Sequence, residues 1–210
     1  MPARKKPARE LLRRIQLLVL DVDGTLTDGR LYYGKDGEAM KAFDVRDGHG
    51  LRLLQMHGGV QLAVLTGRRA DLVLARCREL SIEQIVGSSR AKGPALVGIA
   101  QAMGVPLANV AFMGDDVNDL PALRKAALSM APRDAAAEVL REVQWVSGRD
   151  AGRGAVREAC ELLLAAKVGW PPPEDADVQP EPSPESPATP RSRVRTPPQS
   201  RVRTPPRSPA

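Results

Sequence analysis

The strongest constraint on the fold is an apolar run that ends abruptly in carboxylates and glycines. Residues 15–20 read Ile-Gln-Leu-Leu-Val-Leu, and residues 21–29 continue as Asp-Val-Asp-Gly-Thr-Leu-Thr-Asp-Gly. Such a short apolar run predicts a buried strand of a parallel sheet, and ligands bind at the carboxyl edge of an open α/β sheet. Because side chains alternate along a strand, Asp21 and Asp23 are expected to face one crevice, and Gly24 allows a sharp turn after them.

Two carboxylates that face one crevice repel each other unless a cation lies between them. Mg²⁺ is the expected cofactor, because it prefers oxygen ligands and keeps positions open for water or phosphate. Taken alone, Asp21-Val22-Asp23 could instead form a turn that caps a helix. The choice between these two interpretations depends on the rest of the chain.

Polar residues also follow other predicted strands, which favours the catalytic interpretation. In chain order they are Thr66-Gly67-Arg68 after residues 60–65, Lys92 after residues 84–86, and Gly114-Asp115-Asp116-Val117-Asn118-Asp119 after residues 109–113. A series of Asp-x-Asp, Thr, Lys and Gly-Asp-Asp at strand ends is far more specific than any one of its members.

Strand and helix patterns alternate through residues 15–167. Helices are expected near 48–57, 70–80, 92–103, 117–126, 134–141 and 153–166, and strands also near 127–130 and 143–146. This alternation predicts right-handed crossovers and an α/β three-layer sandwich with a parallel Rossmann-like sheet. The Gly-Lys-Asp-Gly centre of residues 31–43 predicts a small β-hairpin insertion, and no segment has the size of a large cap domain.

The net charge of +6 is confined to the two ends of the chain. Residues 1–14 hold six basic residues against one acid, and residues 170–210 hold six arginines against five acids. The body between them is neutral, so no specific nucleic-acid partner is expected. Cys77 and Cys160 are too few for a disulfide framework, and no apolar stretch suits a membrane span or a signal peptide, so we expect a cytoplasmic protein.

The composition changes after Trp170. Residues 171–210 contain thirteen of the nineteen prolines, and Ser-Arg-Val-Arg-Thr-Pro-Pro occurs at 192–198 and again at 200–206. A low-complexity repeat of this kind predicts a disordered tail, since little apolar surface is available to offset the entropy of ordering. The tail could be a docking segment for an unknown partner or an inert appendage.

The stretch from Asp21 to about Leu164 resembles the haloacid dehalogenase-like phosphohydrolase superfamily, and within it most closely the 3-deoxy-D-manno-octulosonate 8-phosphate phosphatases. The closer resemblance rests on residues 21–29, 41–48, 66–68, 114–119 and 152–158. Composition and patterning divide the chain into a basic extension at 1–14, a domain at 15–168 that the resemblance identifies as a phosphatase domain, and a Pro/Arg-rich tail at 169–210 that the resemblance does not cover. The resemblance also implies a Mg²⁺-dependent phosphomonoesterase of lipopolysaccharide precursor synthesis. The alternatives are a phosphatase of a related nonulosonate 9-phosphate and a catalytically silent scaffold with a docking tail.

Phosphate ester chemistry suggests roles for the acids. Asp21 suits a nucleophile that forms an aspartyl-phosphate, and Asp23 suits a general acid that later acts as base. The resemblance supports both roles and adds Mg²⁺ ligation by Asp21, the Asp23 carbonyl and Asp115. Asp116 is expected to support the metal site from outside it, whereas Asp119 could orient a metal-bound water or cap a helix.

Substrate contacts are the remaining expectation. Thr66, Gly67 and Lys92 are expected to bind the phosphate. The resemblance implies substrate contacts at Asp23, Asp44, Val45, Arg46, Asp47, Gly48, Arg52, Arg68, Arg76 and Lys92, although each arginine could equally be an ordinary surface residue. It also implies a homotetramer in which the hairpins pack together and the tail of one subunit reaches the site of another. The chain departs from the usual family pattern at Thr25, Val86 and Ala151.

Overall fold

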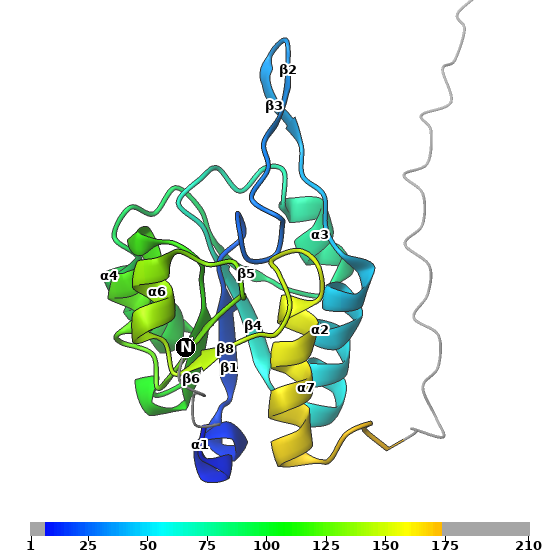
Figure 1. The fold of residues 1–210 in the computed structure, drawn as a ribbon, viewed down its shortest axis with the longest axis vertical. Coiled ribbons are helices and arrows are strands. Elements are labelled where there is room, and N and C mark those ends of the chain that lie inside the picture. Colours follow the sequence, from blue (N-terminus) through cyan, green and yellow to red (C-terminus); the bar gives the residue numbers. More distant parts are fainter. Residues whose placement is uncertain (1–6, 174–210) are drawn as a thin grey trace, which may run out of the picture. The chain divides into compact units, whose positions relative to one another are not determined.

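A six-stranded parallel sheet forms the centre of the fold, as the sequence predicts, with strand order β5-β4-β1-β6-β7-β8 (Figure 1). The structure is a computed structural model that describes residues 7–173. The strands are β1 (Leu17–Leu20), β4 (Gln61–Leu65), β5 (Gln84–Val86), β6 (Val110–Met113), β7 (Leu128–Ala131) and β8 (Trp145–Val146). β1 pairs with β4 on one side and with β6 on the other.

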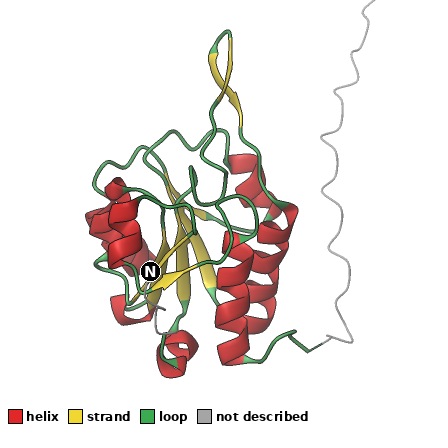
Figure 2. Cartoon of the chain, viewed as in Figure 1, coloured by secondary structure: helices red, strands yellow, loops and turns green. Residues whose placement is uncertain are grey.

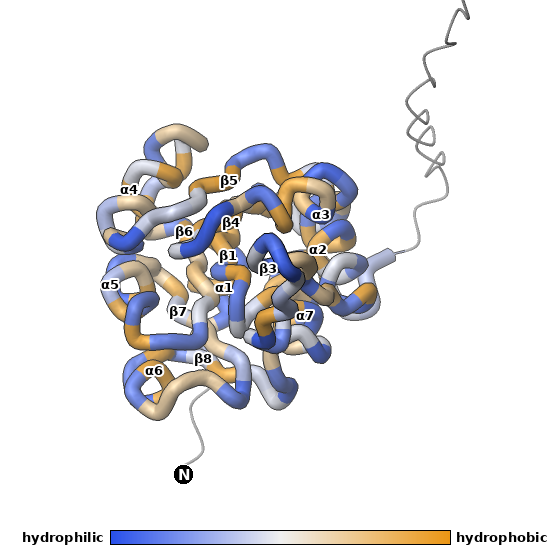
Figure 3. Tube along the Cα trace, turned by 90° about the horizontal axis from the view of Figure 1, so that it is seen from above, coloured by the Kyte–Doolittle hydropathy of each residue, from blue (hydrophilic) through white to orange (hydrophobic). Residues whose placement is uncertain are grey.

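Helices cover both faces of the sheet, which confirms the predicted three-layer sandwich (Figures 2 and 3). One layer consists of α1 (Arg9–Arg14), α2 (Val45–Gly58), α3 (Leu74–Glu79) and α7 (Ala155–Lys167). The other consists of α4 (Lys92–Ala102), α5 (Leu120–Leu123) and α6 (Ala137–Glu142), with the short 3-10 turns η1 (Leu107–Asn109) and η2 (Val117–Asp119) in the connections.

The central strand β1 shows why its sequence is continuously apolar. Leu18 and Leu20 pack into the core beneath α2 and α7, whereas Leu17 and Val19 pack into the core beneath α4 to α6. All four side chains are completely buried. A strand that is covered on both faces has no solvent side for polar residues, so the polar residues begin only where the strand ends.

The chain crosses the sheet at β1. It passes from β1 through α2 to β4 and β5 on one side, and then returns through α4 to β6, β7 and β8 on the other. The strand order therefore reverses between β4 and β6, and such a switch point leaves a crevice at the carboxyl ends of the strands. Asp21, Thr66 and Gly114 are the first residues after β1, β4 and β6, respectively, and all three lie at this edge.

The predicted hairpin is also present, as β2 (Tyr32–Gly34) and β3 (Gly37–Met40), and it projects from the body of the domain (Figure 1). Its two tyrosines are exposed, by 39% at Tyr32 and 67% at Tyr33. Phe43, which follows the hairpin, packs against the core instead. Of these three aromatic side chains, two are therefore exposed and one packs against the core.

Element boundaries differ from the sequence prediction in several places. The helix expected over 70–80 begins only at Leu74, and the helix expected over 117–126 is divided between η2 and α5. Helix α1 is not predicted at all, because residues 1–14 read only as a basic extension. It is anchored by Leu12, which is buried, and by Lys167, whose Nζ donates to the carbonyl oxygen of Arg13 at 2.9 Å.

Cys77 and Cys160 are buried free thiols. Among residues 7–173, no helix is both long enough and apolar enough to cross a bilayer. Nearly all of the predicted tail and its eight-residue repeat fall outside the described residues, so the division at 14 and 168 stays a prediction.

We expect the close packing of α2 on α7 to be sensitive at Gly50. A Cβ at Gly50 would lie 2.8 Å from Cδ and 3.2 Å from Cα of Arg157, whereas a Cβ at Gly98 in α4 would meet nothing within 4 Å. Gly50→Ala should destabilise the protein by about 1–3 kcal/mol through overpacking, measured by denaturant unfolding. The control Gly98→Ala should instead stabilise it by about 0.5–1 kcal/mol. Equal effects at the two sites would contradict this packing.

Candidate active site

The carboxyl edge of the sheet holds a cavity of about 370 Å³. Its lining residues are Asp21, Asp23, Thr66, Gly67, Arg68, Ser89, Arg90, Lys92, Asp115, Asp116 and Asn118. Every residue predicted for catalysis, phosphate binding or metal binding is in this group. The fold therefore brings together side chains from the ends of β1, β4 and β6 and from the start of α4.

Lys92 connects the strand ends. Its side chain is only 2% exposed, and its Nζ lies 2.8 Å from Oδ1 of Asp21 and 2.6 Å from Oδ1 of Asp119. Burial alone would lower the pKa of Lys92, but the two carboxylates outweigh burial and hold the pKa above its ordinary value. The ammonium group therefore remains charged, and paired buried charges of this kind hold each other in place.

Three carboxylates crowd around this ammonium group. Asp21, Asp115 and Asp119 each offer an oxygen atom, and these oxygens all lie within 4.8 Å of one another. Burial, followed by the charge of Asp119, raises the pKa of Asp21 to about 6, although Lys92 opposes the shift. Burial, followed by the charges of Asp21 and Asp119, raises the pKa of Asp115 to about 8. One lysine does not neutralise three acids, so the cluster suits a hard divalent cation with oxygen ligands.

Two glycines permit this close approach. Gly24 has φ +89°, and a Cβ there would lie 2.1 Å from Oδ2 of Asp115. A Cβ at Gly114 would lie 2.5 Å from Cγ of Asp119. The turn expected at Gly24 is present, and the missing side chain also leaves room for the carboxylate that arrives from β6.

Asp119 binds the backbone of the segment that carries Asp115. It is completely buried, and its Oδ2 accepts hydrogen bonds from the backbone N–H of Asp115 at 3.0 Å and of Asp116 at 3.2 Å. Asp116 is exposed, and its carboxylate accepts from the N–H of Val117 at 2.7 Å. Asp119 therefore supports the segment that carries Asp115, a role that the sequence analysis left open. The support expected from Asp116 stays a prediction. The three-residue spacing of Asp116 and Asp119, which is that of a capping box, was the sequence signal that could have identified the turn at Asp119.

Asp23 has a partner that the sequence analysis missed. Its Oδ1 pairs with Nζ of Lys41, whose side chain is 2% exposed. Its Oδ2 is buried without a hydrogen-bond partner among the described residues. Lys41 follows the hairpin, and nothing in its sequence position relates it to a strand end. Asp23 therefore has one oxygen fixed by a cation and one oxygen free for proton transfer.

The loop after β4 is held by its own threonine. The side chain of Thr66 is buried, its Oγ1 accepts from the N–H of Arg68 at 3.1 Å, and its carbonyl accepts from the N–H of Ser89 at 3.2 Å. Because the hydroxyl oxygen is already an acceptor, its proton remains available to a ligand. Gly67 is exposed between these contacts.

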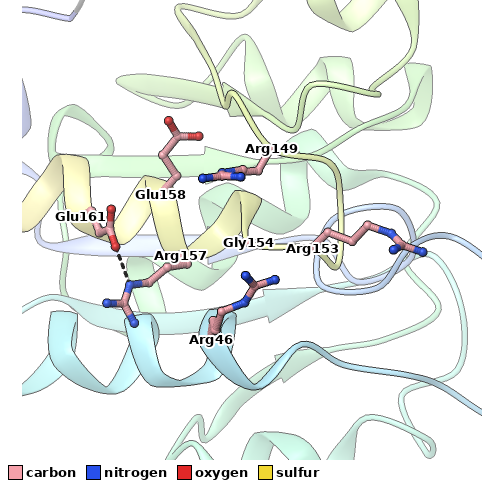
Figure 4. Close-up of a pocket in the computed structure, with 7 residues that line it drawn as sticks. All are labelled: Arg46, Arg149, Arg153, Gly154, Arg157, Glu158 and Glu161. Carbon is pink, nitrogen blue, oxygen red and sulfur yellow. Dashed lines mark hydrogen bonds and ion pairs between the residues drawn. The ribbon is translucent and has the colours of Figure 1, made fainter.

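The remaining predicted substrate residues lie outside this cavity. Arg46 lines a second cavity of about 330 Å³ (Figure 4), whose other lining residues are Arg149, Arg153, Gly154, Arg157, Glu158 and Glu161. Asp44 caps α2 by accepting from the N–H of Arg46 at 2.7 Å, and Val45 is 79% exposed.

The other four members of this group have structural contacts. Asp47 is buried and accepts from the N–H of Gly154 at 3.3 Å and of Arg157 at 2.7 Å, which caps α7. A Cβ at Gly48 would lie 2.0 Å from Nη2 of Arg76, so this glycine makes room for the guanidinium group. Nη1 of Arg52 donates to Oγ of Ser81 at 2.8 Å. Substrate binding by residues 44–48, Arg52 and Arg76 stays a prediction.

The fold and the site together define a class, the haloacid dehalogenase-like hydrolases, and a family model with that description matches residues 76–159. The 3-deoxy-D-manno-octulosonate 8-phosphate phosphatase KdsC of Escherichia coli K12 is 42% identical over 153 residues, which cover 73% of this chain and 81% of that protein. The corresponding Yersinia pestis phosphatase is 39% identical over the same coverage. The chain belongs to this family of phosphatases.

Solved structures agree with this assignment. The Moraxella catarrhalis phosphatase, in complex with a magnesium ion, a phosphate ion and a KDO molecule, is 37% identical with a TM-score of 0.73 over 76% of this chain and 91% of that chain. The cobalt-bound Haemophilus influenzae phosphatase is 38% identical with a TM-score of 0.73 over 75% and 91%. The fold of this chain is thus the fold of that family through the region that carries the site.

The acid cluster predicts a pH-dependent response to Mg²⁺. A carboxyl whose pKa is raised to about 8 by folding destabilises the metal-free protein as pH rises toward that value, because ionisation is harder in the folded state than in the unfolded state. Mg²⁺ binding requires the ionised form, so affinity should rise up to about tenfold per pH unit below that pKa. Mg²⁺ should therefore raise the melting temperature more at pH 8 than at pH 6. An equal or smaller rise at pH 8 would contradict the cluster.

Proposed function

We propose that this protein is a Mg²⁺-dependent phosphomonoesterase that hydrolyses 3-deoxy-D-manno-octulosonate 8-phosphate to the free sugar acid and phosphate. The observation that carries the proposal is the convergence of Asp21, Asp115 and buried Lys92 on one cavity beside Asp23. The substrate is inferred from the family, including the relative that was solved with magnesium, phosphate and KDO. By the same inference, the reaction serves lipopolysaccharide precursor synthesis.

The residues of the acid cluster suit the cation. The Asp21 carboxylate, the Asp23 backbone carbonyl and the Asp115 carboxylate would hold Mg²⁺, which supplies positive charge to the phosphate oxygens when it is bound. Both oxygens of Asp119 already accept hydrogen bonds from Lys92 or from backbone N–H groups. Asp119 therefore orients Lys92 and the segment that carries Asp115.

The reaction proceeds in two displacements. Oδ1 of Asp21 is fixed by Lys92, so the other oxygen attacks phosphorus and the bond from phosphorus to the sugar oxygen breaks. Asp23 gives its proton to the departing sugar oxygen. Asp23 then takes a proton from water as that water attacks the aspartyl-phosphate, which releases phosphate and restores the Asp21 carboxylate. Attacking and leaving oxygens lie in line about phosphorus in each step.

Neutral and positive donors hold the phosphate during both steps. The Thr66 hydroxyl and the Gly67 N–H donate hydrogen bonds to its oxygens, and Lys92 contributes a compact positive charge. A phosphate monoester resists attack because its own charge repels nucleophiles, so these donors reduce the repulsion that Asp21 has to overcome.

Substrate selection involves more than one copy of the chain. Residues 44–48, Arg52 and Arg76 lie outside the catalytic cavity, and the hairpin exposes Tyr33 by 67% and Met40 by 59%. We infer a homotetramer, assembled through the hairpins, in which this second group of residues contacts the substrate of a neighbouring copy. Exposed apolar side chains on one projecting element support an interface there.

Asp21→Asn should lower kcat by at least about 1000-fold, because the amide cannot act as the nucleophile. Phosphate release from 3-deoxy-D-manno-octulosonate 8-phosphate is the measurement, and thermal unfolding should show that the fold remains. The exposed pair of Arg124 with Glu142 provides a matched control, since Glu142→Gln removes one negative charge from a residue that does not line the cavity. Turnover by Asp21→Asn near the control level would contradict the nucleophile assignment.

A substrate comparison separates the proposal from its alternatives. The purified full chain should turn over 3-deoxy-D-manno-octulosonate 8-phosphate with a higher kcat/KM than a nonulosonate 9-phosphate, and chelation should abolish both activities. A chain that lacks residues 171–210 should retain most of its turnover. A preference for the nine-carbon substrate would overturn the substrate assignment, and the absence of any hydrolysis would support the scaffold alternative.

A further inference from the structure

The hairpin brings a carboxylate to the edge of the catalytic cavity. Glu38 lies in β3, and its Oε1 is 2.6 Å from Nζ of Lys41. Its Oε2 is 2.7 Å from Nη2 and 3.3 Å from Nε of Arg68. Each carboxylate oxygen of Glu38 therefore binds a different cation.

Each of these two cations leads to a different part of the site. Lys41 also pairs with Oδ1 of Asp23, the proposed general acid. Arg68 follows the phosphate loop, and its backbone N–H donates to the hydroxyl oxygen of Thr66 at 3.1 Å. Glu38 thus connects the hairpin both to the proton donor and to the loop that binds phosphate.

The surroundings of this network favour the charged forms of Glu38 and Arg68. The side chains of Lys41 and Glu38 are 2% and 15% exposed, and that of Arg68 is 40% exposed. Burial by itself would raise the pKa of Glu38, but hydrogen bonds from Lys41 and Arg68 outweigh burial and hold the pKa below its ordinary value. Charged hydrogen bonds with little water around them have more directional strength than exposed pairs.

We propose that Glu38 is a positioning residue for this reaction, an inference that rests on the proposed function. Glu38 fixes Lys41 against one oxygen of Asp23, so that the other, unpartnered oxygen carries the proton for the leaving group. Its contact with Arg68 fixes Glu38 itself relative to the end of β4. The placement of the hairpin then determines the placement of the acid, which makes the proton transfer depend on an element outside the sheet.

The basicity of the leaving group provides a selective test. Departure of an alkoxide requires a proton from Asp23, whereas departure of p-nitrophenolate requires none. kcat/KM reports the steps through departure of the leaving group, so it isolates this contribution. A purely structural role for Glu38 would instead lower kcat/KM for both kinds of substrate equally.

Glu38→Gln should lower kcat/KM for 3-deoxy-D-manno-octulosonate 8-phosphate and for benzyl phosphate by about 10- to 100-fold, the range expected when general acid catalysis is impaired. It should lower kcat/KM for p-nitrophenyl phosphate by less than about 3-fold. Glu38→Asp keeps the charge and should recover part of the loss. The matched control is Glu142→Gln, which removes a negative charge outside the catalytic cavity and outside the hairpin and should leave all three values unchanged.

A double-mutant cycle and hydrogen exchange complete the test. If Glu38 acts through Lys41, adding Glu38→Gln to Lys41→Met should produce little further loss with benzyl phosphate. Amide hydrogens of residues 37–41 should exchange faster in Glu38→Gln than in Glu142→Gln. Equal losses for benzyl and p-nitrophenyl phosphate, additive effects in the cycle, or unchanged exchange would overturn the role of Glu38. If the wild-type chain hydrolyses benzyl and p-nitrophenyl phosphate but not the sugar acid phosphate, that result would instead contradict the proposed substrate.

Discussion

The charged contact of Lys92 with Asp21 and Asp119 is the interaction on which the site depends. It joins the end of β1, the start of α4 and the turn after β6, three segments that are distant in the sequence. Without the ammonium group, Asp21 and Asp119 would lose the cation with which each is paired among residues 7–173. With it, one oxygen of Asp21 is held in place, and the remaining negative charge of the cluster is left for a cation.

Most of the fold and the centre of the site follow from the sequence for one physical reason. Strands that are buried on both faces can carry polar side chains only where they end, and parallel strands end at the same edge. The polar residues after β1, β4 and β6 therefore lie close together at that edge, and this does not depend on how the helices pack against the sheet. Lys92 can be assigned to the same edge because it is the first residue of α4, the helix that follows β5. The sequence therefore predicts that Asp21, Thr66, Lys92 and Asp115 share one site.

The rest of the site depends on packing that no local pattern reveals. Glu38 and Lys41 bind Asp23 and Arg68, which line the cavity, although the hairpin itself projects from the domain, and their spacing in the sequence indicates only a hairpin. The role of Asp119 depends on whether its turn faces the core, which a Gly-Asp-Asp motif does not specify. The arginines of residues 44–52 lie elsewhere in the domain, because α2 starts beside α7 and away from the cavity. Helix α1 was missed because the burial of Leu12 depends on α7.

The central claim is that Asp21 and Asp115 share one divalent cation at the carboxyl edge of the sheet. The most direct measurement is anomalous diffraction from crystals of the full chain soaked in Mn²⁺, which takes the same oxygen ligands as Mg²⁺ and can be located by its signal. The account predicts one strong peak about 2 Å from a carboxylate oxygen of Asp21 and of Asp115. The absence of a peak there, or a peak bound only to other side chains, would contradict it.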